Sequence, residues 1–142
     1  MMISSKGRYA LRVLIDLAES GDNSYIPARD LAARATLSPK YLESILALLS
    51  RAGLVEGVHG KGGGYRLNVA PRDCTVGRIL KLTEGSLSPV SCLENGKPCC
   101  ENAAGCRTLP LWSKLDTIID EYLESVSLAD LTRSVRDGNY VV

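Results

Sequence analysis

The chain has 142 residues, enough for one domain with a hydrophobic core or for a small domain with an appendage. It contains no Phe and one Trp, so the core must be built mainly from Leu, Val, Ile and Ala, and the formal net charge of +1 indicates no particular partner. No stretch approaches the ~18–20 unbroken apolar residues of a membrane-spanning helix, and the N-terminus lacks the apolar core of a secretory signal, so we expect a cytoplasmic protein with no membrane partner.

Charge is distributed unevenly along the chain. Residues 1–85 carry 12 Lys and Arg against 8 Asp and Glu, a net +4, whereas residues 86–142 carry 5 against 8, a net −3. A basic first part and an acidic second part favour contact between the first part and a polyanion.

The first half of the chain predicts three helices. Residues 5–19, 27–35 and 39–52 each repeat apolar side chains at helical spacing. We expect Ser5 to cap the first helix and Ser38 to cap the third, because a serine hydroxyl accepts a hydrogen bond from a free N–H of the first turn.

The next segment predicts a β-hairpin with a glycine-rich turn. The runs LVEGVH and YRLNVA flank GKGGG, and the second run alternates apolar and polar side chains as a strand does. The match to a phosphate-binding P-loop is weak, because Lys61 is followed by Gly62 instead of Ser or Thr. At a hairpin tip the glycines would let the backbone approach a phosphate closely, with His59 and Arg66 as flanking basic contacts.

The predicted elements follow the order of a winged helix-turn-helix domain: two helices, a turn, a third helix, a hairpin and a further helix over residues 75–84. We therefore expect a mostly α fold with a small β wing, and the third helix in the major groove of DNA. Lys40, Glu43 and Ser44 on that helix suit a groove roughly 12 Å wide. The alternative that the pattern leaves open is an ordinary small α+β domain without a ligand.

The second half predicts a loop and a long helix. We divide the chain into a DNA-binding domain (1–85), a cysteine-rich sensor loop (86–108), and a dimerisation helix with the C-terminal tail (109–142). The apolar stripe of the helix over 109–126 has no obvious cover in its own chain, so it predicts a homodimer. The expected interface residues are Leu111, Leu115, Ile118, Ile119 and Tyr122.

Four of the five cysteines lie within fifteen residues of the sensor loop, in the pattern C-x6-CC-x5-C. In a reducing compartment such clusters are more often metal ligands or redox switches than structural disulfides. Thiolates select iron–sulfur clusters, zinc or Cu(I), and the wide gaps favour a cluster over a zinc knuckle. The candidate ligands are Cys92, Cys99, Cys100 and Cys106. The simplest all-cysteine site would use all four. Because adjacent side chains such as those of Cys99 and Cys100 tend to point apart, we expect three of them to bind, and Glu94, Glu101 or a small molecule to complete the site.

Two other functions are weighed against a cluster-controlled regulator. One is a cluster-free regulator whose thiols respond directly, by disulfide formation or persulfidation. The other is an enzyme with a nucleophilic cysteine, which needs an activating base. The only His, His59, lies in the predicted wing, so we do not expect an enzyme.

The sequence resembles the Rrf2 family of bacterial transcription regulators. The resemblance rests on SKGRYAL, LSPKYLESIL, GLVEGVHGKGGGYRL and TVGRIL and covers nearly the whole chain. It implies a homodimer that binds a palindromic site on double-stranded DNA, and in cluster-bearing members a [2Fe–2S] or [4Fe–4S] cluster on three cysteines of each subunit. The gap of five residues before Cys106 matches that of the relatives, so the resemblance favours Cys100 over Cys99 as a ligand. Relatives take the fourth cluster ligand from one of two positions, a His three residues after the last cysteine or an acid in the first helix. This chain departs from the family at both, where it has Leu109 and Arg8. The candidate DNA contacts are Lys6, Ser38, Lys40, Tyr41, Glu43, Ser44, His59, Gly60 and Lys61.

Overall fold

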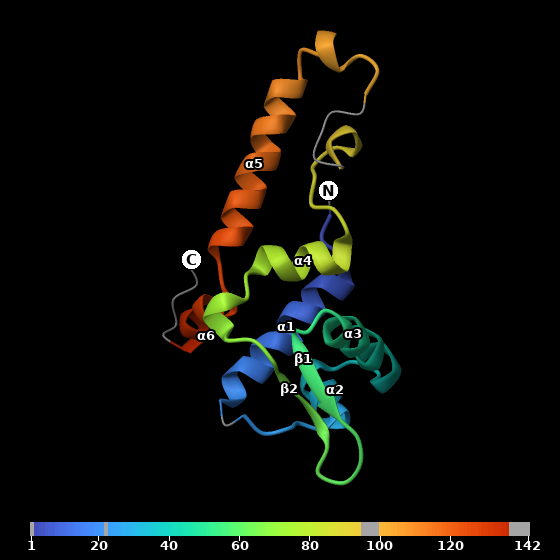
Figure 1. Ribbon diagram of the computed structural model, residues 1–142, viewed down its shortest axis with the longest axis vertical. Coiled ribbons are helices and arrows are strands. Elements are labelled where there is room, and N and C mark those ends of the chain that lie inside the picture. Colours follow the sequence, from blue (N-terminus) through green and yellow to red (C-terminus); the bar gives the residue numbers. More distant parts are fainter. Residues whose placement is uncertain (1, 22, 95–99, 137–142) are drawn as a thin grey trace.

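The structure is a computed structural model that describes residues 2–21, 23–94 and 100–136. Its helices are α1 (Ser5–Ser20), α2 (Ala28–Ala35), α3 (Pro39–Arg51), α4 (Val76–Glu84), α5 (Leu109–Ser125) and α6 (Leu128–Arg136). Strands β1 (Val55–Val58) and β2 (Gly64–Leu67) form an antiparallel hairpin, and the short 3-10 helices are η1 (Pro71–Asp73), η2 (Ser91–Leu93) and η3 (Ala103–Gly105). The predicted mostly α fold with a small β wing is confirmed (Figure 1).

Serine and threonine side chains begin most of these helices. The Ser38 hydroxyl accepts a hydrogen bond from the Tyr41 N–H at 3.2 Å, as predicted, and Thr75 caps α4 in the same way. The cap of α1 is Ser4, whose hydroxyl accepts from the Gly7 N–H at 3.1 Å. The prediction of Ser5 was therefore one residue late, because two adjacent serines offer the same capping chemistry.

The main core lies between α1, α2, α3 and the root of the wing. The buried face of α3 is fully enclosed, and its members Leu42, Ile45, Leu46 and Leu49 are each 0% exposed. Burying a side chain of this size stabilises the fold by about 1.5–3 kcal/mol. The core therefore fixes which face of α3 remains outside.

The wing is joined to the segment between α1 and α2. In the hairpin Glu56 is paired with Arg66 and Gly57 with Tyr65. The backbone of Tyr65 also exchanges two hydrogen bonds with Ile26, at 2.9 and 2.8 Å. Ile26 thus acts as a one-residue third strand that holds the hairpin against the start of α2.

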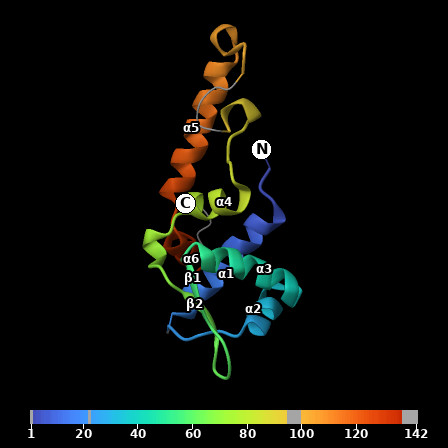
Figure 2. The same cartoon turned by 45° about the vertical axis from the view of Figure 1, so that its right-hand side comes forward.

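The last part of the chain forms an arm and then returns to the body. Helix α5 rises away from the winged-helix part, and η3 of the sensor loop lies at its far end, while the wing projects at the opposite end of the molecule (Figures 1 and 2). A small second core at the base of the arm contains Val76, Leu80, Leu87 and Val126. Leu128 of α6 is 0% exposed within the main core, so α6 packs onto the DNA-binding part of the chain.

The helices that the structure describes include none long and apolar enough to span a bilayer.

Candidate functional site

The first two turns of α3 present polar groups to solvent. Lys40, Glu43 and Ser44 are exposed, and Lys40 and Glu43 lie three residues apart, on one face. A cation, a carboxylate and a hydroxyl are groups that hydrogen-bond to base edges and phosphates. The Ser44 hydroxyl donates to the Tyr41 carbonyl at 2.6 Å, so it also has a partner within the helix.

Two of the predicted DNA contacts are only partly exposed. The Tyr41 ring meets the Tyr9 ring edge-on, with centroids 6.1 Å apart, and the Arg12 guanidinium lies 5.3 Å from the Tyr9 centroid. Tyr41 therefore joins α3 to α1. Lys6, in the first turn of α1, is half-buried. Sequence reasoning missed Arg12, although its spacing from Tyr9 on one helix would have predicted their contact.

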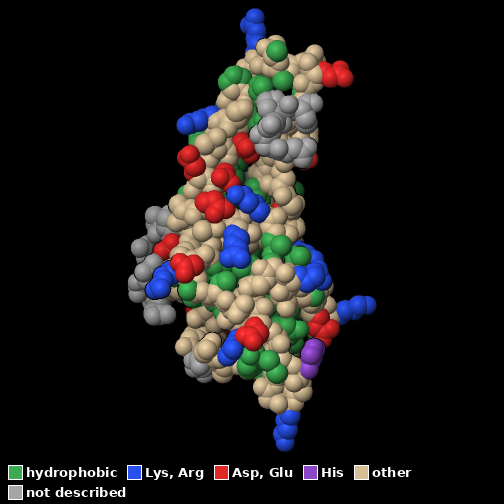
Figure 3. Space-filling view, viewed as in Figure 1, with side chains coloured by type: hydrophobic (Ala, Val, Ile, Leu, Met, Phe, Trp, Pro, Cys, Tyr) green, Lys and Arg blue, Asp and Glu red, His purple; other side chains and the backbone are tan. Residues whose placement is uncertain are grey.

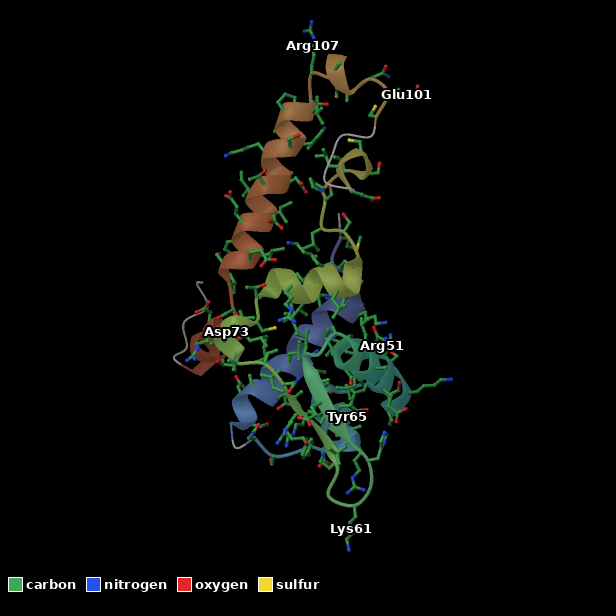
Figure 4. The ribbon with its side chains drawn as sticks, viewed as in Figure 1. Arg51, Lys61, Tyr65, Asp73, Glu101 and Arg107 are labelled. Atoms are coloured by element: carbon green, nitrogen blue, oxygen red, sulfur yellow. The ribbon has the colours of Figure 1, made fainter. Side chains whose placement is uncertain are left out.

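The tip of the wing is exposed and has a backbone that requires glycine. Gly60 and Gly62 have φ of 94° and 77°, and the Gly63 N–H donates to the Gly60 carbonyl at 3.0 Å. A Cβ on Gly63 would clash with the carbonyl oxygen of Val58. Lys61 points away from the body at the end of the hairpin (Figure 4), and His59 and Gly60 beside it are exposed.

A cleft of about 610 Å³ separates the wing tip from the start of α2. Tyr25, Arg29 and Lys61 are among its lining residues, so two cations face the same open space. The Arg29 side chain is 85% exposed, and its contact with Asp30 is long, at 3.8 Å. Arg29 was not predicted as a contact, although its place in the first turn of a helix-turn-helix helix was a usable signal.

Arg66 differs from its predicted role. It was expected to flank the wing tip as a DNA contact. Its guanidinium instead pairs with Glu56 at 3.0 Å and lies 4.5 Å from the centroid of the Tyr25 ring. The side chain is thus engaged within the protein at the root of the wing.

The surface charge follows the division seen in the sequence. Basic side chains are scattered around the wing and α3, while acidic side chains gather over α5 near its junction with α4 (Figure 3). Asp120 and Glu124 of α5 both pair with Lys81 of α4, at 2.5 and 3.0 Å. These carboxylates raise the pKa of Lys81, and the pairs fix the angle between the two helices.

The three described cysteines of the sensor loop do not converge. Cys92 is half-buried in η2, Cys100 is exposed, and Cys106 follows η3. Cys99 lies outside the described residues. Within residues 2–21, 23–94 and 100–136, no three Cys, His, Asp or Glu side chains lie close enough together to hold a metal ion. The donor set has the chemistry of a soft-metal or cluster site, but the described conformation does not assemble it.

Cys106 and Cys74 have opposite environments. The Cys106 Sγ lies 3.4 Å from the Thr108 Oγ1, and hydrogen bonds from Thr108 lower the pKa of this thiol. Cys74 is 0% exposed, and burial raises its pKa. Because the thiolate is both the metal ligand and the nucleophile, the environment of Cys106 favours its reactive form, whereas Cys74 packs in the core.

Helix α5 leaves an apolar face open. Leu111, Leu115, Ile118 and Tyr122 are 59, 37, 49 and 50% exposed, and their spacing of four, three and four residues follows one stripe. Ile119, predicted on the same interface, is half-buried and packs against the second core of its own chain. The open stripe therefore consists of the other four predicted residues.

Comparison with known proteins identifies one family and two groups of relatives. The family model Rrf2, described as an iron-dependent transcriptional regulator, matches residues 3–134. The HTH-type transcriptional regulator IscR of Aliivibrio salmonicida is 36% identical over 131 residues, which is 92% of this chain and 77% of that protein.

Solved structures of similar fold include further regulators of these kinds. CymR (YrzC), titled the global cysteine regulator of B. subtilis, superposes with a TM-score of 0.77 at 35% identity, covering 94% of this chain and 97% of that one. T. potens IscR superposes with a TM-score of 0.77 at 32% identity, covering 100% and 93%. The family match and the curated relatives are named transcriptional regulators, which confirms the expectation of a regulator over an enzyme.

Proposed function

The chain belongs to the Rrf2 family of transcriptional regulators, and from this premise we propose that it binds a palindromic operator as a homodimer whose DNA affinity is set by its cysteine loop. The observation that carries the proposal is the pairing of an exposed polar face on α3 with an exposed glycine-rich wing tip that ends in Lys61. A regulator of bacterial promoters acts where the chromosome lies, so this proposal also places the protein in the cytoplasm.

The two DNA-facing elements have separable roles. Lys40 and Glu43 on α3 meet base edges: Glu accepts from cytosine N4, and Lys donates to guanine or phosphate. Lys61 at the wing tip contacts phosphate or the minor groove, which adds affinity but little sequence information. The alternative for Glu43 is that it only orients Lys40.

Substitutions distinguish these roles. Lys61→Ala should weaken binding about equally across sequences and lower the salt slope by roughly one unit. Glu43→Ala should relax discrimination at one base pair per half-site by ~1–3 kcal/mol. Lys114→Ala, on α5, is the matched control and should leave both quantities unchanged. An unchanged preference profile in Glu43→Ala, measured against single-base variants, excludes base reading by that residue.

Dimerisation through α5 supplies a second α3 helix and wing, which bind the second half-site of the palindrome. The exposed stripe of Leu111, Leu115, Ile118 and Tyr122 fits a second copy of itself across a two-fold axis. Half-sites on DNA lie about one helical turn apart, ~34 Å, or a multiple of it. The dimer must therefore hold its two α3 helices at that separation.

For the cofactor, we propose an iron–sulfur cluster held by Cys92, Cys106 and one of Cys99 and Cys100. Such a cluster, [2Fe–2S] or [4Fe–4S], supplies sensitivity to iron, oxidants or nitric oxide when bound. Its support is the soft donor set, the family description as iron-dependent, and the lowered pKa of Cys106. Because Leu109 and Arg8 cannot ligate iron, the fourth ligand is Glu94, Glu101 or a small molecule.

Anaerobic purification tests the cluster directly. The protein should be brown, with iron and acid-labile sulfide in similar amounts. Cys92→Ala and Cys106→Ala should each abolish the colour, and the control Cys74→Ala should retain it because that thiol lies in the core. A colourless protein with stoichiometric zinc, or with no metal after reconstitution, contradicts the cluster.

A second candidate is a cluster-free thiol regulator of the same fold. Two observations favour it: the described cysteines do not converge on a metal site, and the fold matches a solved cysteine regulator at a TM-score of 0.77. In this case the colourless protein still binds DNA, and its affinity changes on mild oxidation and recovers with a reducing thiol.

The position of the sensor loop explains how either chemistry reaches DNA. The loop joins α4 to α5, and Lys81 holds these helices together through Asp120 and Glu124. Ordering the loop therefore acts on the angle between the dimer helix and the DNA-binding part. A shift of a few ångströms between the two α3 helices is enough to remove base contacts from one half-site.

A further inference from the structure

We propose that Arg66 is a positioning residue, which fixes the direction of the wing and does not itself bind DNA. The inference rests on the proposed DNA-binding function and adds a determinant of how the wing meets the phosphate backbone. It is carried by contacts of the guanidinium with two other segments of the protein, β1 and the segment between α1 and α2.

The first contact is across the hairpin. Arg66 and Glu56 are directly opposed in the antiparallel register, and both side chains lie on one face of the sheet. The Arg66 Nη2 lies 3.0 Å from the Glu56 Oε2, and the Nε donates to the same oxygen at 3.1 Å. The two strands are thus connected by a charge-assisted pair just below the exposed part of the hairpin.

The second set of contacts reaches the segment between α1 and α2. The guanidinium stacks over the Tyr25 ring at 4.5 Å from its centroid, and the Nη1 donates to the Asn23 carbonyl at 3.4 Å. A planar guanidinium can stack and donate sideways simultaneously, which a lysine ammonium cannot do. Arg66 therefore joins both strands of the wing to a segment outside the sheet.

The neighbouring residue completes the attachment on the backbone. Tyr65 exchanges two hydrogen bonds with Ile26, next to Tyr25. The wing root is therefore held by the backbone of Tyr65 and by the side chain of Arg66. Beyond these two positions Gly63 and Gly64 are half-buried and residues 57–62 are exposed, so the direction of the tip is set at the root.

The charge of Arg66 also makes it a poor phosphate ligand. Its positive charge is neutralised by Glu56, and its Nε and Nη2 are directed to that carboxylate. The pair is 30% and 43% exposed, so its contribution to global stability is small. Its effect is expected on wing geometry, and hence on DNA affinity through Lys61.

Removing Glu56 gives a test in which the two roles predict opposite signs. If Arg66 were a DNA contact, Glu56→Ala would free a cation, remove a carboxylate near DNA and strengthen binding. If Arg66 positions the wing, Glu56→Ala should weaken binding about tenfold, equivalent to ~1.4 kcal/mol. Asp30→Ala is the matched control: it removes an exposed carboxylate at the start of α2 without touching the wing root, and binding should stay equal or become tighter.

Arg66 variants supply a second readout. Arg66→Lys keeps the positive charge but loses the stacking on Tyr25 and the paired N–H contacts to Glu56. It should therefore weaken DNA binding about as much as Arg66→Ala. In a Lys61→Ala background, Arg66→Ala should have less than a twofold further effect, because both act through the same tip. All variants are compared by DNA titration after circular dichroism has shown native helix content and melting temperature.

The inference is overturned if Glu56→Ala binds more tightly than wild type, if Arg66→Lys binds as wild type, or if Arg66→Ala and Lys61→Ala weaken binding additively. Each of these results would make Arg66 a direct phosphate contact. Failure of the proposed function looks different: the wild-type protein itself would then select no DNA sequence from a random pool.

Discussion

Helices α3 and α5 both carry an apolar stripe, but only one of them is covered. In α3 the stripe of Leu42, Ile45, Leu46 and Leu49 is 0% exposed. In α5, which is four residues longer, no residue is buried and four large apolar side chains are 37–59% exposed. The same helical periodicity thus builds a core within the chain in α3 and leaves an exposed apolar surface in α5, which we propose meets a second copy.

The difference assigns a role to each helix. Because the apolar face of α3 is used inside the chain, its opposite, polar face is free to meet DNA in a fixed orientation. Because the apolar face of α5 is open, burying it against a second copy would stabilise the proposed dimer in a way that depends on protein concentration. Removing side chains from the two stripes should therefore give different kinds of defect.

The largest effect is expected in the α3 stripe. Leu46→Ala removes a fully buried side chain and should lower the free energy of unfolding by about 2–5 kcal/mol. Urea denaturation followed by circular dichroism measures this loss, which should be the same at low and high protein concentration. A loss that disappears at high concentration would place Leu46 in an interface instead of the core.

The next effect is expected in the α5 stripe. Ile118→Glu combined with Tyr122→Glu puts charges into the proposed dimer contact and should raise the dimer dissociation constant at least ~100-fold, equivalent to ~2.7 kcal/mol. Light scattering should then report the monomer mass. Thr117→Glu, an exposed neighbour off the stripe, is the control and should remain dimeric; an unchanged mass in the double variant would move the interface elsewhere.

A smaller effect is expected at the junction of the two regions. Lys81→Met removes the ion pairs to Asp120 and Glu124, which are well exposed, so the cost should be below ~1 kcal/mol. The carboxylates raise the pKa of Lys81 in the fold, so this contribution is present below the unfolded-state pKa of about 10.4 and is lost as pH rises through the higher folded value.

Urea titrations of wild type and Lys81→Met at pH 8 and at pH 11.5 measure this. The difference in the free energy of unfolding between the two proteins should be smaller at pH 11.5 than at pH 8. A difference that grows with pH would mean that the lysine acts through its aliphatic stem and not through its charge.

The smallest effect is expected at Cys106. Thr108→Val removes the hydroxyl that lowers the pKa of Cys106, so the thiol should alkylate more slowly near neutral pH and its pH profile should move upward. Iodoacetamide labelling of the metal-free protein, read by mass spectrometry, measures the rate at each cysteine. Cys100, exposed on the same loop, is the internal control; a parallel change at Cys100 would indicate a general opening of the loop.

The winged-helix part was predictable because its signals are local. The three helices, the Ser38 cap and the glycine-rich turn each follow from a few adjacent residues, and the stripe on α5 follows from periodicity. The return of Leu128 to the main core was not predictable, because nothing in a short amphipathic segment says which core it joins.

The site was predictable in its residue types but not in all its contacts. Exposure of Lys40, Glu43 and Lys61 follows from the faces of α3 and the hairpin. The inward role of Arg66 depends on Tyr25 and Asn23, which lie about forty residues earlier, and no local pattern connects them. The contact of Ile119 with the second core was not predictable for the same reason: periodicity gives a stripe but not which edge of it the chain itself covers.

Selection of DNA from a random pool tests the proposed regulator most directly. Wild-type protein should enrich a palindrome with two half-sites about one helical turn apart, or a multiple of it. The Ile118→Glu and Tyr122→Glu double variant should lose that enrichment while retaining native helix content. Enrichment of single, unpaired half-sites by the wild type, or of no sequence at all, would contradict a dimer that reads DNA through α3 and the wing.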